Sequence, residues 1–397
     1  MSEWKSKKLG DVTALMTKGI APSYVEVEGE NTAWVLNQKC NRDFVISYVD
    51  ARLNDLSKKK VPAERFLKPG DVLINSTGTG TAGRVAQIYD IPAPTTIDGH
   101  MILLRPTDEI DPLYFGYVLK GYQYQIESFA EGSTGQTEVN KKRLADEIIV
   151  SYPVSLAEQR KLAEILGNID EKIDVNKKIN KNLEQQALSI FSQEFLSFDG
   201  NLPEGWKEGN LLDIADYLNG LAMQKFRPKD GEDGIPVLKI KELRQGSCDA
   251  SSELCSPSIK PEYIVHDGDV IFSWSGSLLV DFWCGDTCGL NQHLFKVTSK
   301  SYDKWFYYAW TNYHLAKFVA LAADMATTMG HIKREELAKS EVLIPSDTDY
   351  ERIGSLLQPI YDLIITNRIE NRKLSTLRDE LLPQLMSGSI DLSEVVI

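Results

Sequence analysis

The chain has 397 residues, of which 42% are apolar and 25% charged, and its formal net charge is −13. This length suits two to four domains, and the acidic balance argues against an indiscriminate nucleic-acid coat while allowing local basic faces on a specific binder. No run approaches ~18 apolar residues and the chain start is no secretory signal, so no membrane span is expected. Five cysteines without framework spacing indicate a reduced, cytoplasmic protein rather than a disulfide scaffold.

Residues 1–152 have the pattern of an α/β domain. Short apolar runs such as Val72–Asn75 and 85–88 predict strands between Gly- and Pro-containing turns, and 112–130 predicts one or two helices. His100 directly precedes another alternating, strand-like run.

The stretch from Thr77 to Arg84 is rich in glycine and has two interpretations. Gly78, Gly80 and Gly83 permit a tight turn between the neighbouring strands. Alternatively, the backbone N–H groups of this loop cradle a phosphate, and Arg84 adds positive charge. Both interpretations remain open from the residues alone.

Residues 153–200 predict a first long helix and a linker. Alternating steps of four and three residues place one stripe of side chains on a common face, which is the pattern of a coiled-coil seam. The seam positions are Leu162, Leu166, Ile169, Ile173, Asn176, Asn180 and Leu183. A helix of ~40 residues is ~60 Å long, so we expect a partner to bury it. The two asparagines cost stability in a seam but fix its register and partner.

Residues 201–346 repeat the features of the first domain. The matched pairs include Trp4 with Trp206, Gly70-Asp71-Val72-Leu73 with Gly268-Asp269-Val270-Ile271, His100 with His293, and Leu144 with Leu337. Residues 304–322 again predict one or two helices. Its aromatic residues are expected to pack on a sheet, with base stacking as the alternative: Trp305, Phe306, Tyr307, Tyr308 and Trp310.

Residues 347–397 predict a second long helix and a tail. Its seam positions lie 191 residues after those of the first helix: Ile353, Leu357, Ile360, Ile364, Asn367, Asn371 and Leu374. An antiparallel pair with a pseudo-twofold axis is the simplest way to bury both seams. In the register that we expect, Asn176 faces Asn371 and Asn180 faces Asn367.

The order of globular domain, helix, globular domain and helix resembles the specificity subunit of type I restriction-modification systems. The segments that carry the resemblance are Ser133-Thr134-Gly135-Gln136, Val139, Leu144, Tyr152-Pro153, Glu158-Gln159-Arg160-Lys161-Leu162 and the glycine-rich stretch. The second half departs from this pattern at three places: Thr327-Thr328-Met329-Gly330, Tyr350-Glu351-Arg352 and the shorter Ser273-Trp274-Ser275-Gly276-Ser277.

The resemblance implies an α+β fold. Two pseudo-repeated α/β target recognition domains, 1–152 and 201–346, would each precede a long helix, in 153–200 and 347–397, and the helices would pack as an antiparallel coiled coil. It also implies a non-catalytic subunit that recognises double-stranded DNA with a bipartite target. Two methyltransferase subunits and restriction/translocase subunits would join it. S-adenosylmethionine, ATP and Mg²⁺ would belong to those partners.

Specific DNA binding needs phosphate anchors and groups that contact base edges. The candidates in the first half are Lys39, Arg42, Lys58, Lys59, Lys60, Thr77, Thr79, Arg84, Ser133, Thr134, Gln136, Lys141, Lys142 and Arg143. Those in the second half are Lys225, Arg227, Lys229, Lys239, Lys241, Arg244, Ser275, Thr327, Thr328, His331, Lys333 and Arg334. The alternative for any one of these lysines or arginines is an ordinary solvated side chain.

Three further alternatives stay open. Cys248, Cys255, Cys284, Cys288 and His293 are imaginable zinc ligands, but their spacing fits no standard pattern and favours buried thiols. The outward side chains of the first long helix are solvated or form a docking face. The whole chain is alternatively a protein-interaction scaffold, or a self-sufficient DNA methyltransferase or nuclease, although the sequence lacks the standard phosphate-binding loop.

Overall fold

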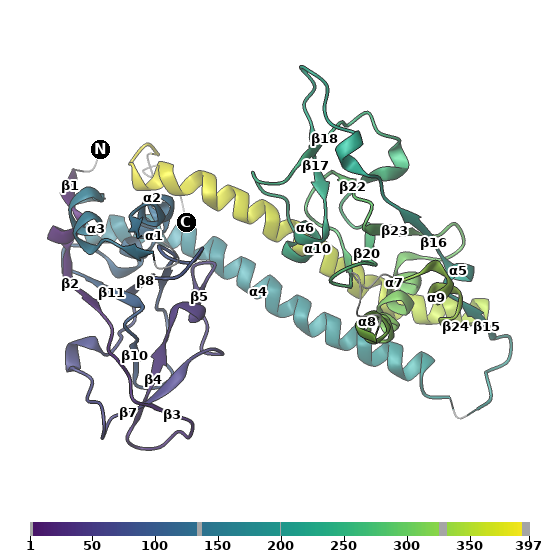
Figure 1. Ribbon diagram of the computed structural model, residues 1–397, viewed down its shortest axis with the longest axis horizontal. Helices are drawn as coiled ribbons and strands as arrows, with labels where there is room; N and C mark the ends of the chain where they lie inside the picture. The colour runs from purple at the N-terminus through teal and green to yellow at the C-terminus, as the bar shows by residue number, and fades with distance from the viewer. Residues whose placement is uncertain (1–2, 133–136, 199, 325–331, 391–397) are drawn as a thin grey trace. The chain divides into compact units, whose positions relative to one another are not determined.

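The computed structural model describes residues 3–132, 137–198, 200–324 and 332–390, which form two compact units. Unit 1 consists of Met1–Glu171 with Thr376–Ile397, and unit 2 consists of Lys172–Ser375. Each unit therefore holds one globular region and parts of both long helices (Figure 1). The division into four segments at residues 152, 200 and 346 stays a prediction; the compact units follow other boundaries, because both long helices pass from one unit to the other.

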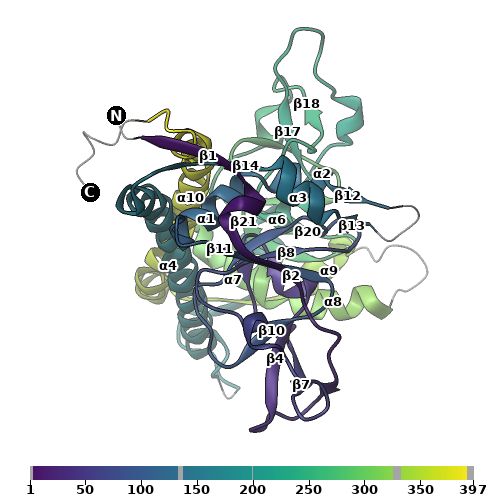
Figure 2. The same cartoon turned by 90° about the vertical axis from the view of Figure 1, so that its left-hand side faces the viewer.

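Unit 1 contains two four-stranded sheets (Figure 2, purple and blue). The first, β2-β11-β8-β9, is antiparallel, and in the second, β10-β4-β7-β3, strands β10 and β4 are parallel. A ribbon of β1 and β14 joins the chain start to the residues before α4. The bounds are β1 Trp4–Lys8, η1 Leu9–Val12, β2 Thr13–Lys18, β3 Tyr24–Val25, β4 Thr32–Leu36, η2 Gln38–Cys40, β5 Asn41–Arg42, β6 Val45–Ile46, β7 Arg52–Asp55, η3 Ala63–Arg65, β8 Val72–Asn75, β9 Val85–Gln87, β10 Thr95–Ile97, β11 Met101–Pro106, α1 Pro112–Gly121, α2 Gln123–Ser128, β12 Ala130–Glu131, β13 Glu138–Val139, α3 Lys141–Glu147, β14 Ile149–Pro153 and α4 Leu156–Phe195.

Unit 2 repeats most of this topology. Its antiparallel sheet is β16-β23-β20-β21, its mixed sheet is β18-β17-β22-β19 with β17 parallel to β22, and its ribbon pairs β15 with β24. The bounds are β15 Lys207–Asn210, α5 Leu211–Ile214, β16 Asp216–Asn219, η4 Met223–Lys225, β17 Ile235–Leu238, α6 Ile240–Gln245, β18 Leu254–Cys255, η5 Pro261–Tyr263, β19 Ile264–Val265, β20 Val270–Ser273, β21 Leu279–Phe282, β22 Cys288–Leu290, β23 Leu294–Thr298, α7 Lys304–Tyr313, α8 Leu315–Asp324, α9 Arg334–Ala338, β24 Glu341–Ile344 and α10 Asp347–Met386. The antiparallel sheets have the same strand order, and each mixed sheet holds a parallel pair extended by one antiparallel strand, β7 on β4 and β18 on β17, which confirms the internal repeat. The fourth strand differs, because β3 pairs with β7 whereas β19 pairs with β22.

The helices predicted at 112–130 and 304–322 are each two helices that meet at a single residue. Asp111 caps α1 by accepting hydrogen bonds from the N–H groups of Leu113 and Tyr114, and Pro112 suits the first helical position. The first pair breaks at Tyr122. The second pair breaks at His314, whose imidazole Nε2 bonds the carbonyl oxygen of Glu341 at 2.8 Å.

The predicted packing of the aromatic residues on their sheet is confirmed. Trp305, Phe306, Tyr307 and Trp310 are buried in the unit 2 core with residues of β20, β21 and both long helices. The ring of Tyr308 stacks on Phe282 with centroids 4.0 Å apart. These rings are therefore unavailable for stacking on bases.

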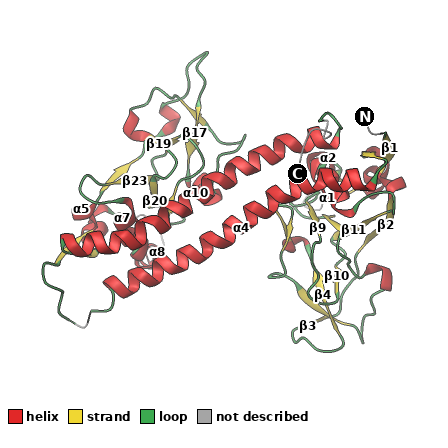
Figure 3. Cartoon of the chain, turned by 180° about the vertical axis from the view of Figure 1, so that it is seen from behind, coloured by secondary structure: helices red, strands yellow, loops and turns green. Residues whose placement is uncertain are grey.

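The long helices α4 and α10 pack together within each unit (Figure 3). In unit 2, Asn176 Nδ2 donates to Asn371 Oδ1 at 2.9 Å, and Asn367 Nδ2 donates to Asn180 Oδ1 at 2.8 Å. These bonds confirm the predicted antiparallel register. In unit 1, Leu162 and Leu166 of α4 share a core with Leu382 and Leu385 of α10. Among the described residues, no helix is long and apolar enough to cross a membrane.

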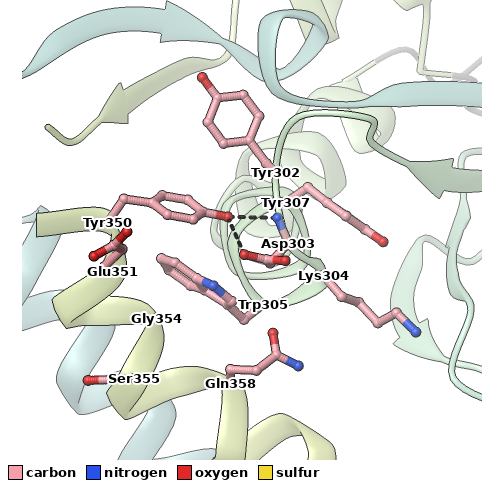
Figure 4. A pocket seen from close by; sticks show the side chains of 10 residues that line it. All are labelled: Tyr302, Asp303, Lys304, Trp305, Tyr307, Tyr350, Glu351, Gly354, Ser355 and Gln358. Carbon is pink, nitrogen blue, oxygen red and sulfur yellow. Dashed lines mark hydrogen bonds between the residues drawn. The ribbon is translucent and has the colours of Figure 1, made fainter. Parts of the chain in front are cut away.

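A side chain near the start of each long helix accepts a hydrogen bond from a backbone N–H of the globular region, and the residue type of this side chain differs between the units. In unit 1, the fully buried Gln159 accepts from the N–H of Asp111 at 2.8 Å and donates to the carbonyl oxygens of Glu109 and Pro153. In unit 2, the Tyr350 hydroxyl accepts from the N–H of Asp303 at 2.6 Å and donates to its carboxylate. Figure 4 shows this contact beside an open cavity of about 580 Å³. The tyrosine thus replaces the glutamine that the resemblance had led us to expect.

The two asparagine pairs between the long helices are Asn176 with Asn371 and Asn180 with Asn367. We expect the contributions of the two members of a pair to stability to depend on each other. Asn180→Ala leaves the buried amide of Asn367 without its acceptor, so we expect the free energy of unfolding to fall by about 1–3 kcal/mol. The double variant Asn180→Leu/Asn367→Leu removes both amides and should be near wild type or more stable, because no polar group is left unpaired. Urea unfolding of the purified chain measures both. A double variant whose loss of stability equals the sum of the losses of the Asn180→Leu and Asn367→Leu single variants would show that the two side chains act independently.

Candidate nucleic-acid interface

Loops that lie at strand ends meet on one side of unit 1. We call them the first loop cluster: residues 38–42, 76–84, 98–100 and 138–142. The N–H of Val139 donates to the carbonyl oxygen of Ser76 at 2.8 Å. The Thr77 hydroxyl donates to Gln38 Oε1 at 3.3 Å and lies 2.8 Å from His100 Nδ1. Segments that are up to a hundred residues apart in the chain therefore form one surface.

The glycine-rich loop is the turn between β8 and β9. Gly78, Gly80 and Gly83 all have positive φ, at 121°, 70° and 90°. A Cβ at Gly83 would also lie 2.5 Å from the Cα of Glu127 in α2, so this position needs glycine for space as well as for conformation. The guanidinium of Arg84 donates to the carbonyl oxygen of Gly80 at 3.2 Å. The turn interpretation is confirmed, and phosphate binding by this loop stays a prediction.

Several polar atoms at the base of this loop have no partner. They are Asn41 Oδ1, Asn75 Oδ1, Ser76 Oγ and Thr81 Oγ1, which are buried and unpaired within the described part of the chain. The amide nitrogens of both asparagines are paired, since Asn41 Nδ2 donates to the carbonyl oxygen of Arg84 and Asn75 Nδ2 donates to that of Gln38.

Unit 2 has an equivalent second loop cluster, formed by residues 239–241, 274–277, 291–293 and 332–334. The N–H of Ile332 donates to the carbonyl oxygen of Trp274 at 3.0 Å, as Val139 does to Ser76 in unit 1. Ser275 Oγ lies 3.1 Å from His293 Nδ1, which repeats the pair of Thr77 and His100. The hydroxyl–histidine contact is thus present in both units.

Close backbone contact holds both histidine turns in place. A Cβ at Gly19 would lie 2.1 Å from the carbonyl oxygen of Ile97, and one at Gly220 would lie 2.4 Å from that of Leu290. Any side chain at either glycine would displace the turn. The N–H of His100 donates to the buried carboxylate of Asp98 at 2.9 Å. Burial raises the pKa of Asp98, and this N–H opposes the rise.

Most predicted DNA-contacting residues that the structure describes are exposed or half-buried, and many lie in the two loop clusters. Those in the clusters are Lys39, Arg42, Thr77, Thr79, Arg84, Lys141, Lys142, Lys239, Lys241, Ser275, Lys333 and Arg334. Of these, Ser275 is buried, with 1% of its surface exposed, and faces His293 rather than solvent. Lys58, Lys59 and Lys60 follow β7, outside the first cluster.

Several predicted cations are engaged by acidic side chains. Arg143 contacts Glu131 at 2.8 Å and Glu147 at 2.7 Å. Its hydrogen bonds lower the pKa of both carboxylates below their ordinary value. In unit 2, Lys239 and Arg227 share Glu253, and the hydrogen bond from Lys239 lowers the pKa of that carboxylate. These cations must exchange partners before they can contact a phosphate.

Other candidates lie beyond these clusters. Lys225 and Lys229 flank Arg227 in the loop after β16, and Arg244 is exposed in the last turn of α6. Six candidates fall outside the described residues: Ser133, Thr134, Gln136, Thr327, Thr328 and His331.

The sequence interpretation did not select His100, Gln38 or Gln292 as site residues, and it considered His293 only as an imaginable zinc ligand. The repeat of both histidines was visible in the sequence, but their hydroxyl partners were not, because the pairing depends on how distant strands meet.

The cysteines do not form a metal centre in the described part of the chain. All five are free thiols, and four of them are buried. Among the described residues, no group of three or more histidine, cysteine, aspartate or glutamate side chains is arranged to hold a metal ion. Burial raises the pKa of Cys255 and of Cys284 to about 11, which is typical of inert structural thiols.

Comparison with known proteins identifies one family. The model of the type I restriction modification DNA specificity domain matches residues 1–185 and 203–376. The chain is 25% identical to the type I restriction enzyme MjaIX specificity subunit of Methanocaldococcus jannaschii, across 99% of this chain and 95% of that protein. It is 20% identical to the HindI specificity subunit of Haemophilus influenzae, across 98% and 100%. The S subunit structure from M. genitalium has a similar fold, with a TM-score of 0.59, 14% identity, and coverage of 97% and 96%.

Two glycines of the loop should respond differently to substitution. Gly80→Ala meets no atom within 4 Å but retains a φ of 70°, so we expect a loss of about 1–2 kcal/mol from backbone strain alone. Gly83→Ala adds a collision with the Glu127 backbone and should cost more. Thermal unfolding of both variants tests this order. Equal stabilities would mean that α2 moves aside easily.

Proposed function

Because the chain belongs to the family of type I restriction modification DNA specificity domains, we propose that it is the DNA-recognition subunit of a type I restriction-modification complex, with no catalytic role of its own. The observation that supports this most directly is the duplication of the loop cluster. Two equivalent sets of loops, each with exposed cations and amide or hydroxyl groups, suit two contacts with DNA.

Each unit contacts one part of a split target in this proposal. Exposed lysines at the start of α3 and α9 supply phosphate contacts: Lys141 and Lys142 in unit 1, and Lys333 with Arg334 in unit 2. The glycine-rich loop adds backbone N–H groups and Arg84 in unit 1. Base contacts come from the polar side chains between these anchors. The net charge of −13 confines binding to these clusters and disfavours coating of DNA.

The two long helices set the distance between the half-sites in this proposal. Each helix has 40 residues and contributes to both units. The paired asparagines fix the register of one helix against the other. A helix pair of fixed register is a stiff connection, so only half-sites with the correct gap can engage both units.

The catalytic steps then belong to partner subunits. We propose that two methyltransferase subunits and restriction/translocase subunits join this chain on DNA, and that S-adenosylmethionine, ATP and Mg²⁺ bind to those subunits. The MjaIX and HindI relatives are themselves specificity subunits of type I restriction enzymes. The exposed apolar side chains of the helices, including Leu188, Leu356 and Leu363, offer surface for such assembly.

A map of modified bases tests the proposal. The chain and its methyltransferase partner are expressed in a host without DNA methylation, and the genome is sequenced with a method that detects N6-methyladenine. We expect one split motif with a fixed gap, which disappears when this chain is omitted. Methylation that persists without the chain would support a scaffold role instead. Binding of S-adenosylmethionine, or Mg²⁺-dependent cleavage of DNA, by the isolated chain would support an enzyme.

Lysine variants provide a matched control for the same assay. Lys141→Ala/Lys142→Ala lies in the first loop cluster, whereas Lys58→Ala/Lys59→Ala/Lys60→Ala removes exposed lysines outside it. The first variant should weaken binding to all sequences and reduce its salt dependence, while keeping the motif. The second should have the smaller effect.

Lengthening the helices should change the gap but not the half-sequences. Seven residues are inserted between Glu171 and Lys172 of α4, and seven between Ser375 and Thr376 of α10, positions that face each other in the asparagine register. Each insertion adds about 10.5 Å of helix, which corresponds to up to about three base pairs. The modified-base map measures the new gap. Insertion into α4 alone breaks the register and serves as the control; an altered half-sequence would contradict the proposal.

A further inference from the structure

The turns that carry His100 and His293 have the same backbone hydrogen bond, but the residue before the histidine differs. Each turn connects a strand of the mixed sheet to a strand of the antiparallel sheet, β10 to β11 in unit 1 and β22 to β23 in unit 2. In each, the histidine N–H donates to the side chain two residues earlier, Asp98 or Asn291. The residue between is Gly99 in unit 1 and Gln292 in unit 2.

With the Gln38 and Gln292 amides oriented as they are, the hydrogen bonds favour one tautomer of both imidazoles. The single hydroxyl hydrogen of Thr77 is donated to Gln38 Oε1, so Thr77 Oγ1 accepts from His100 Nδ1–H. In unit 2, the Gln292 amide nitrogen lies 3.3 Å from His293 Nε2 and can only donate, so Nε2 accepts and Nδ1–H donates to Ser275. Both rings therefore direct Nδ1–H inward and use Nε2 as an acceptor.

The surroundings of Nε2 differ between the two turns. His100 is exposed, and among the described residues its ring makes a hydrogen bond only through Nδ1, so its Nε2 faces no protein donor. Gln292 caps the equivalent atom of His293 through its amide nitrogen. Gln292 is half-buried, and among the described residues its side-chain oxygen makes no hydrogen bond, so this oxygen is the acceptor that the turn has left.

We propose that these turns are equivalent base-contacting sites, with His100 as the contacting group in unit 1 and Gln292, oriented by His293, in unit 2. The inference rests on the proposed DNA-recognition function. The ligand is the exocyclic amino group of a base in the major groove, adenine N6 or cytosine N4, which are the donors that this groove presents to an acceptor. Thr77 and Ser275 are positioning residues, because they hold the rings and do not face the ligand.

The residue before each histidine, Gly99 or Gln292, can be exchanged for its counterpart in the other unit. A Cβ at Gly99 would lie 3.7 Å from its nearest neighbour, the carbonyl oxygen of Ile20, and Gly99 is not among the residues with positive φ. Gly99→Gln therefore builds the unit 2 turn in unit 1 without strain. Gln292→Gly does the reverse. His100→Ala and His293→Ala remove the rings, and His266→Ala, at an exposed histidine before β20, is the control.

The test combines the modified-base map of the whole complex with competition binding to duplexes that differ at single bases. Gly99→Gln and His100→Ala should change or relax one base position of one half-site, with discrimination at that position falling on the order of 10- to 100-fold. Gln292→Gly and His293→Ala should do the same in the other half-site. The gap, the remaining bases and the melting temperatures of the Gly99, His100 and Gln292 variants should stay unchanged.

Two results would overturn the inference, and they are distinguishable. If the wild type has a split motif and all four variants keep it unaltered, or lose affinity equally for every sequence with a weaker salt dependence, the turns contact phosphate or serve only the fold. If the wild-type complex has no split motif, the proposed function and this inference fail together.

Discussion

The packing of α4 against α10 is the constraint on which the rest of the molecule depends. Each globular region completes its core with residues of both helices, Leu162 and Leu382 in unit 1 and Phe191 and Leu357 in unit 2. The helices are thus part of each core as well as a connection between the units. A change of register would shift every apolar side chain that the helices contribute, and the asparagine pairs oppose such a change.

Charged side chains reinforce this packing where the helices meet the globular regions. In unit 1, Asp170 of α4 bonds Arg378 of α10 at 2.7 Å and Lys120 of α1 at 3.2 Å. Burial alone would raise the pKa of Asp170, but the two cations lower it below its ordinary value. In unit 2, Arg372 of α10 bonds Asp267 at 2.7 Å. One helix therefore carries anchoring arginines for both units.

The sequence predicted those features of the fold that depend on helical periodicity or on the internal repeat. The helix seam, its register and the matched strands follow from spacing along the chain, and the hydrogen bonds of Asn176 and Asn180 to Asn371 and Asn367 agree with them. It did not predict the unit boundaries, because these pass through continuous helices. It also missed the hydroxyl–histidine pairs, since each joins loops of different sheets. The sequence also did not show that Tyr350 takes the role of Gln159. Each side chain accepts a hydrogen bond from the N–H of an aspartate, Asp111 or Asp303, so the two units share the bond although the residue types differ.

The discontinuity of unit 1 affects how the chain folds during its synthesis. The segment from Thr376 onward supplies Leu382, Leu385 and Arg378 to a unit whose other residues end at Glu171. A ribosome that makes about 5–20 residues per second needs roughly 10–40 s to translate the intervening unit. During this interval the nascent first unit exposes the apolar side chains that α10 later covers. Unit 2, whose residues are contiguous, is the first part of the molecule that can be completed.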